Sequence, residues 1–323
     1  MMKKAIVHAG MAGALWGGVI VLPSLLGDIH PVVISCARFG LYGLFAAAIA
    51  LPHARRLSSR LTPRDTRLLL ELALTGNVAY FILLTAAVQY AGVAIAALIN
   101  GLVPVAVMLI GRRHIQASRL SVSLSLTLIG VGIVCMNVPV LLRFLQGAGD
   151  WRDLIGVLCG SLGVMSWAWF ALRNAQQLKA GRFSAREWST LQGIATGVVA
   201  VMILVLVAVL QPRILPLELS SERWLAFAAA ALFMSVGGSW IANALWNSSA
   251  QRLPVSVGGQ MIVFETCCAL LYGYLLAWQW PQTNEVLGML LILGGVMWAL
   301  RAEQRVSGPR QIPPGNPIAE PEQ

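Results

Sequence analysis

Long apolar runs separated by short polar segments recur along the whole chain. Most of them approach the roughly 20 residues that an α-helix needs to cross the hydrocarbon core of a bilayer. Helices are required there, because an open strand edge cannot satisfy its backbone polar groups in lipid. We predict ten membrane-spanning helices, at residues 5–27, 31–51, 68–89, 93–111, 120–142, 154–173, 188–210, 224–246, 255–277 and 286–300.

The ten predicted spans divide into two groups of five whose C-terminal parts resemble each other. Residues 98–111 and 128–136 match residues 260–273 and 291–298 at an offset of 162 or 163 positions. A group with an odd number of spans leaves the membrane on the side opposite to its entry. The second group must therefore cross the membrane upside down relative to the first.

This pattern predicts an all-α integral membrane protein with ten transmembrane helices in two inverted five-helix repeats. The first repeat covers residues 1–142 and the second covers residues 143–300. Residues 301–323 are polar and rich in proline towards their end, and we expect them to form a disordered cytoplasmic tail.

Composition excludes a soluble protein. Apolar residues make up 58% of the chain and charged residues only 11%, whereas about 25% are charged in ordinary soluble domains. The net charge is nevertheless +10. A nucleic-acid binder would need these cations on one folded polar face, so we expect the bilayer and a small molecule as partners and no nucleic acid. Whether the chain also forms a homodimer stays open.

The positions of Lys and Arg predict the orientation of the chain. With the N-terminus inside, 18 of the 23 cationic residues fall in inside segments and four in outside loops, while Arg38 lies within a span. Cytoplasmic loops carry such an excess of Lys and Arg. We therefore predict a multi-pass membrane protein with both termini in the cytoplasm.

Inverted repeats are typical of secondary transporters, which bind substrate near the bilayer midplane between the repeats. The chain contains no G-x-x-x-x-G-K-[ST] motif for nucleotide hydrolysis. We predict a secondary transporter, not an enzyme, that moves a small molecule by alternating access. Two alternatives stay open. One is a non-transporting scaffold or receptor, and the other is an intramembrane enzyme, which would need clustered catalytic groups at membrane depth.

Four short motifs support this interpretation by their order and spacing. They are the Gly13–Gly17 run, Arg38-Phe39, the segment 97–105, and Phe264-Glu265-Thr266. With them, residues 8–300 resemble an EamA-type member of the drug/metabolite transporter superfamily. The resemblance implies ten helices in two inverted repeats and small-molecule transport across a bacterial inner membrane, often as export. Thr266 departs from the pattern, since the family often has proline there.

Two ionisable residues fall inside predicted spans, Arg38 in the second and Glu265 in the ninth. A charge at the bilayer centre costs at least about 2.5–3.5 kcal/mol on insertion scales, so it needs a reason. One hypothesis makes Glu265 a titratable gate through which protons couple to transport, with Arg38 as substrate anchor or counter-ion. The alternatives are a fixed Arg38–Glu265 pair, or a neutral Glu265 that hydrogen-bonds a neighbouring helix.

Several uncharged residues within the spans are further candidates for lining a substrate cavity. Polar side chains in membranes also serve as interhelical hydrogen bonds, and mid-span tryptophans are unusual because Trp prefers the interface. The predicted cavity residues are Trp16, Asn77, Tyr80, Asn100, Trp167 and Asn243, together with Arg38 and Glu265. Trp188, near a span end, is interpreted as an interfacial anchor. Histidines and cysteines show no metal-ligand spacing, so we expect no metal or other cofactor.

Overall fold

The computed structural model describes residues 2–110, 119–146, 150–250 and 255–306, and every regular element within these ranges is helical. Six helices are long and apolar enough to cross a membrane, and they lie at Lys4–Leu26, Pro31–Arg60, Pro63–Ala91, Trp151–Lys179, Ala185–Leu210 and Ser221–Ser249. Four shorter apolar helices accompany them, at Val93–Val107, Ser123–Gly132, Glu265–Ala277 and Thr283–Gly295.

Up to residue 146, the described residues form eight α-helices and three short segments of other helix types. They are α1 (Met2–Val21), the 3-10 turn η1 (Leu22–Leu26), α2 (Pro31–Ala50), the 3-10 turn η2 (Leu51–His53), α3 (Ala54–Arg60), α4 (Pro63–Leu72), the π-helical η3 (Ala73–Val78), α5 (Ala79–Ala91), α6 (Val93–Asn100), α7 (Val103–Ile110) and α8 (Arg119–Leu145).

The second part, from residue 150, has a similar make-up. It contains α9 (Trp151–Lys179), α10 (Ala185–Leu210), the 3-10 turn η5 (Pro212–Ile214), α11 (Ser221–Ser235), the π-helical η6 (Val236–Ile241), α12 (Ala242–Ala250), α13 (Val255–Ala277) and α14 (Thr283–Val306). The first six residues of the predicted tail continue α14, and residues 307–323 lie outside the described residues.

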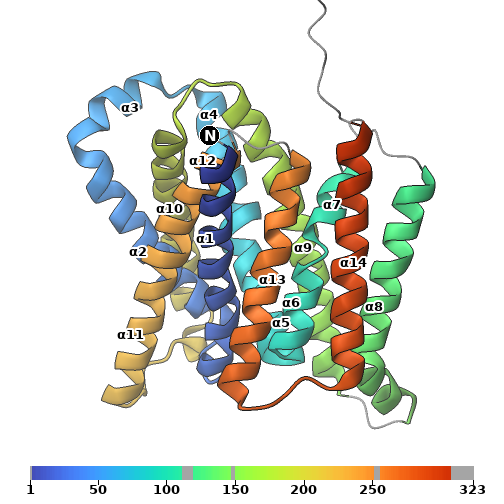
Figure 1. Cartoon of the computed structure of the whole chain (residues 1–323). Coiled ribbons are helices and arrows are strands. Elements are labelled where there is room, and N and C mark those ends of the chain that lie inside the picture. Colours follow the sequence, from blue (N-terminus) through green and yellow to red (C-terminus); the bar gives the residue numbers. More distant parts are fainter. Residues whose placement is uncertain (1, 111–118, 147–149, 251–254, 307–323) are drawn as a thin grey trace, which may run out of the picture.

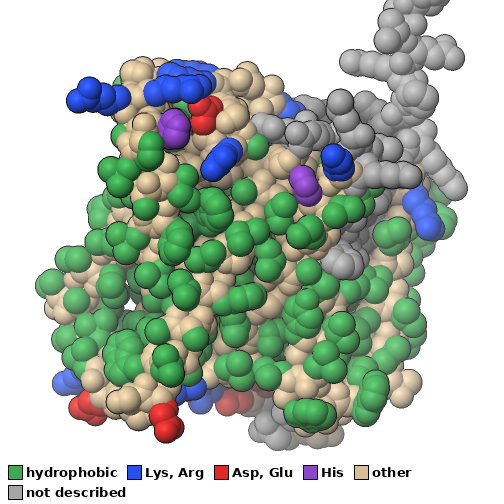
Figure 2. Space-filling model, turned by 60° about the vertical axis from the view of Figure 1, so that its left-hand side comes forward, with side chains coloured by type: hydrophobic (Ala, Val, Ile, Leu, Met, Phe, Trp, Pro, Cys, Tyr) green, Lys and Arg blue, Asp and Glu red, His purple; other side chains and the backbone are tan. Residues whose placement is uncertain are grey.

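The helices form a bundle with one apolar belt between two polar ends. Figure 1 shows the N-terminus, the helix α3, the start of α4 and the last turn of α14 at the same end of the bundle. In Figure 2, Lys and Arg side chains gather at that end, whereas green apolar side chains cover most of the surface between the two ends. Such a belt matches the hydrocarbon region of a bilayer.

Two helices of the bundle contain a single wide turn. The segment η3 joins α4 to α5, and η6 joins α11 to α12. Isolated π turns within α-helices often occur at functional sites. Here they present carbonyls to neighbouring helices, because Ser35 Oγ donates to Val78 O at 3.2 Å and Trp16 Nε1 donates to Gly238 O at 2.7 Å.

Helix α2 packs closely against α10 through two facing glycines. A Cβ atom added to Gly43 would lie 2.4 Å from Gly197 Cα, and one added to Gly197 would lie 2.5 Å from Gly43 Cα. Backbone atoms cannot yield to such a contact as a flexible side chain can. Small residues at this crossing therefore permit the close approach of the two helices, as is common in membrane proteins.

This contact predicts that Gly43→Ala destabilises the folded protein by about 1–3 kcal/mol, because the added methyl group overpacks the crossing. Gly40→Ala is the matched control on the same helix, since its Cβ would meet no atom within 4 Å. Thermal unfolding of the purified protein in detergent measures both. Equal melting temperatures for the two variants would contradict the proposed contact.

Candidate functional site

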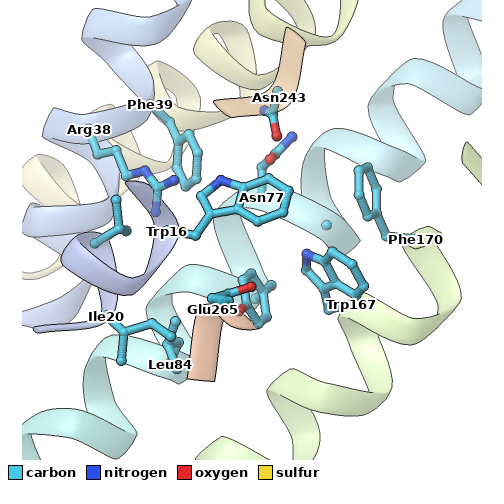
Figure 3. Close-up of a pocket in the computed structure, with 13 residues that line it drawn as sticks. Trp16, Ile20, Arg38, Phe39, Asn77, Leu84, Trp167, Phe170, Asn243 and Glu265 are labelled. Atoms are coloured by element: carbon cyan, nitrogen blue, oxygen red, sulfur yellow. The ribbon is translucent and has the colours of Figure 1, made fainter. Parts of the chain in front are cut away.

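A small polar cavity lies at the centre of the bundle, and residues from both parts of the chain line it (Figure 3). Its volume is about 30 Å³, which is room for one or two water molecules and too little for a metabolite. Seven of the eight predicted site residues line it, namely Trp16, Arg38, Asn77, Tyr80, Trp167, Asn243 and Glu265. The eighth, Asn100, hydrogen-bonds two of them.

Arg38 is buried on α2 and takes its partners from the wide turn η6 and from two aromatic rings. Its Nε donates to Ser239 Oγ at 2.9 Å, and its Nη2 donates to Gly238 O at 3.3 Å. The guanidinium carbon lies 4.7 Å from the ring centroid of Phe39 and 4.2 Å from that of Phe81. A desolvated cation is stabilised by such ring faces, so this charge is held without a carboxylate.

Glu265 is buried on α13 at the end of a chain of hydrogen bonds. Asn100 Nδ2 donates to Glu265 Oε1 at 3.1 Å, and the Tyr80 hydroxyl donates to Asn100 Oδ1 at 2.8 Å. These bonds join α5, α6 and α13. Glu265 thus accepts a hydrogen bond from a neighbouring helix.

Arg38 and Glu265 both line the cavity but form no ion pair. None of the ion pairs among the described residues, with N···O distances up to 4.0 Å, joins these two side chains. Each has its own partners on other helices. The fixed Arg38–Glu265 pair is therefore absent in this conformation.

Three tryptophans form an aromatic cluster beside these polar groups. The ring centroids are 6.5 Å apart for Trp16 and Trp167, 5.4 Å for Trp16 and Trp246, and 6.2 Å for Trp167 and Trp246. Phe170 lies 5.9 Å from Trp167 and extends the cluster. These ring faces can stack on an aromatic molecule or contact a cation.

The remaining predicted residues hold helices together around the cavity. Asn77, within η3, donates from Nδ2 to Thr196 Oγ1 on α10 at 2.9 Å. Asn243, on α12, also lines the cavity, and Figure 3 shows its side chain pointing towards that of Asn77. Asn77 thus both lines the cavity and hydrogen-bonds a neighbouring helix, two roles that the sequence presents as alternatives.

Several functional neighbours are missing from the sequence-based set. Trp246 lies three residues after Asn243, and this helical spacing, which places both on one face, is the sequence signal that indicates it. Gly238 and Ser239 carry no recognisable signal, because the wide turn of η6 gives them their role. Among the described residues, no group of three His, Cys, Asp or Glu is placed to hold a metal ion.

The prediction that Trp188 is an interfacial anchor is wrong. Its side chain is fully buried, and its Nε1 donates to Asn174 Oδ1 at 2.8 Å. Asn174 Nδ2 in turn donates to Asn247 Oδ1 at 3.1 Å, and Asn247 Nδ2 donates to Ser189 Oγ at 2.7 Å. Trp188 thus belongs to a buried polar network of α9, α10 and α12, where its indole N–H finds a partner.

Comparison with known proteins gives three consistent findings. Residues 3–138 match the model of the EamA-like transporter family. The chain is 31% identical over 311 residues to the inner membrane protein YtfF of Escherichia coli (strain K12), with 94% of this chain and 96% of that protein covered. A solved crystal structure is similar in fold, with a TM-score of 0.64 at 19% identity, covering 94% of this chain and 100% of that chain.

The site geometry predicts that Arg38 is coupled more strongly to Ser239 than to Glu265. Double-mutant cycles of Arg38→Met with Ser239→Ala and of Arg38→Met with Glu265→Gln measure both coupling energies from unfolding in detergent. We expect about 1.5–3 kcal/mol for the Ser239 cycle, as for hydrogen bonds to charged groups, and less for the Glu265 cycle. The reverse order would show that Arg38 and Glu265 form a pair.

Proposed function

The chain belongs to the EamA-like transporter family of the drug/metabolite transporter superfamily, and we propose that it exports a small molecule across the inner membrane by alternating access. The observation that carries this proposal is the small central cavity, which Arg38, Glu265, Trp16 and Trp167 line together. We further propose that the chain spans the membrane ten times, as two inverted five-helix repeats.

Matching positions along the chain support the two repeats. The wide turns begin at Ala73 and Val236, 163 positions apart. The same offset relates two tight contacts between α8 and α14. A Cβ on Gly132 would lie 2.7 Å from Ile292 Cγ1, and one on Gly295 would lie 2.8 Å from Ile129 Cγ1. Adding 163 to the residue numbers of the first half converts Gly132 into Gly295 and Ile129 into Ile292, so the two contacts correspond to each other.

The packing of the helices supports the same relation. In the first half α1 packs against α12 and α13, and in the second half α9 packs against α5, α6 and α7. The remaining large contacts, α2 with α10 and α8 with α14, join counterparts. Exchanging the halves therefore leaves these pairs of packed helices unchanged, as expected for repeats related by a two-fold axis in the membrane plane.

Both halves contribute to the cavity. Trp16, Arg38 and Tyr80 come from the first half, whereas Trp167 and Glu265 come from the second. Substrate sites of transporters with inverted repeats lie at this interface. The mixture of a guanidinium, a carboxyl group and indole rings suits a small molecule with both polar and apolar parts, including an aromatic one.

Ion pairs join the two halves at the arginine-rich end of the bundle. Arg182 Nη1 lies 2.7 Å from Asp65 Oδ2, and Arg60 Nη1 lies 2.9 Å from Glu187 Oε1. Asp65 is the third residue of α4, after the N-cap Thr62. We call these two ion pairs the inner latch.

A matching contact joins the halves at the opposite end. Arg223, the third residue of α11 after the N-cap Ser220, bonds Asp28 in the loop before α2, with Nε donating to Oδ2 at 2.8 Å. Hydrogen bonding from Arg223 lowers the pKa of Asp28 below its ordinary value, which keeps this exposed pair charged as the pH falls through the usual carboxyl range. We call it the outer latch.

The two latches occupy corresponding places in the two halves with the charges exchanged. The Asp65–Arg182 pair of the inner latch corresponds to the outer latch. In both, the third residue of a helix pairs with the loop that connects the first two predicted spans of the other half. Both latches are formed here, while the central cavity has a volume of only about 30 Å³. Opening one latch at a time would expose the cavity to one side of the membrane and then to the other.

Orientation follows from the same arrangement. We propose that the inner latch faces the cytoplasm, because the arginines of α3 and α4 lie at that end. A cysteine introduced as Ser59→Cys, in a variant without the five native cysteines, should react with a membrane-impermeant maleimide only after spheroplasts are permeabilised. Ser221→Cys, at the other end, should react in intact spheroplasts. Labelling with the opposite sidedness would reverse the proposed topology.

The proposed function is tested by transport itself. Compounds are first selected by the protection that overexpression gives against their toxicity, and each selected compound is then measured in proteoliposomes with an imposed pH gradient. Flux above that of protein-free liposomes is the expected result. Selected compounds that cross no faster than in protein-free liposomes would contradict the transporter proposal.

Glu265→Gln should abolish accumulation driven by the pH gradient, because the amide cannot take up or release a proton at the cavity. It should retain exchange of labelled for unlabelled substrate at equal pH, since the amide oxygen can still accept from Asn100. The control is Glu222→Gln, which alters an exposed carboxylate in the first turn of α11. Gradient-driven accumulation by Glu265→Gln at the wild-type level would exclude Glu265 as the coupling group.

A further inference from the structure

A second and larger cavity lies at the arginine-rich end, between the first turns of α4 and the C-terminal end of α9. It encloses about 560 Å³, far more than the central cavity. Four guanidinium groups line it, together with two carboxylates, two glutamine side chains and one leucine. The arginines are Arg64, Arg67, Arg173 and Arg182. Neither the transport proposal nor the latches account for an open space of this size.

Both carboxylates of this cavity are already engaged. Asp65 accepts from Arg182 at 2.7 Å and also caps α4 through Thr62. Glu71 accepts from Trp169 Nε1 at 2.8 Å and from Arg173 Nε at 3.3 Å.

The other two arginines, Arg64 and Arg67, are exposed and form no ion pair within the described part of the chain. The cavity therefore holds a surplus of two cations. It also adjoins the N-terminal turn of α4, where the helix dipole favours an anion. A phosphate group matches the planar donor sets of two neighbouring guanidinium groups.

The surface below the cavity is apolar and exposed. Trp169, whose indole is bonded to Glu71, is 43% exposed, and Met165, one turn away on α9, is 53% exposed. On the facing segment Leu70 and Leu74 are 43% and 46% exposed. An indole at this position is typical of the interface between headgroups and acyl chains. A ligand that fits both surfaces is an amphiphile with an anionic head.

We propose that this cavity binds the phosphate headgroup of an anionic phospholipid, with its acyl chains along the apolar surface of Leu70, Leu74, Met165 and Trp169. Arg64 and Arg67 supply the uncompensated charge for the phosphate. The headgroup would lie on the same side of the membrane as the inner latch. Basic pockets between membrane helices recognise lipid headgroups by this chemistry. The inference is independent of which molecule the central cavity transports.

The test uses the full chain in a neutral detergent, with dioctanoyl phosphatidylglycerol as the anionic probe and dioctanoyl phosphatidylcholine as the zwitterionic one. Binding is followed by the shift in melting temperature and by native mass spectrometry. We expect saturable binding of the anionic probe, weakened at least tenfold by Arg64→Gln with Arg67→Gln. The matched control, Arg55→Gln with Arg186→Gln, removes two exposed cations from the same end but outside the cavity and should bind as the wild type.

Three results would overturn the proposal. They are equal binding of the two lipids, unchanged binding by the Arg64/Arg67 variant, and equal weakening in the control variant.

Competition with inorganic phosphate and with glycerol phosphate identifies the source of the anion. We expect neither to displace the lipid at millimolar concentration, and displacement by either would indicate a soluble anion as the ligand. The single variant Arg67→Gln, with an intermediate loss expected, provides the measurement if the double variant does not fold.

Discussion

Polar groups at membrane depth must find their partners within the protein, and the wide turn η6 meets this requirement at the centre of the molecule. Its carbonyl at Gly238 accepts from both Trp16 and Arg38, and its Ser239 hydroxyl accepts from Arg38. In a regular α-helix these carbonyls would accept hydrogen bonds from the backbone N–H groups of the same helix. The position of the buried cation, and with it the polar character of the cavity, depends on this turn.

The counterpart η3 serves the other half in the same way. Its carbonyls at Thr75 and Val78 accept from Ser166 and Ser35, and its Asn77 points into the cavity. Both wide turns thus accept hydrogen bonds from the other part of the chain. In the alternating access that we propose, a small cavity between two formed latches would correspond to a state between the two open ones. The proposed lipid site shares Asp65 and Arg182 with the inner latch.

Much of the architecture follows from simple features of the sequence. Apolar runs predict where the helices lie, and the candidate side chains Arg38 and Glu265 meet in one cavity because intramembrane charges must face inward. Sequence periodicity does not reveal the wide turns, since a π turn shifts the register by one residue without a distinctive composition. It also misplaces Trp188, because a tryptophan near a span end looks interfacial whether or not Asn174 is there to accept its N–H.

Pulsed spin-label distance measurements test alternation between the two ends most directly. One variant carries labels at positions 59 and 186 beside the inner latch, and another carries them at positions 27 and 222 beside the outer latch. The measurements are made in bilayers at pH 5 and pH 8, and with a transported compound. We predict that the 59–186 distance lengthens only while the 27–222 distance stays short, and the reverse. Both distances lengthening together, or neither changing under any condition, would contradict it.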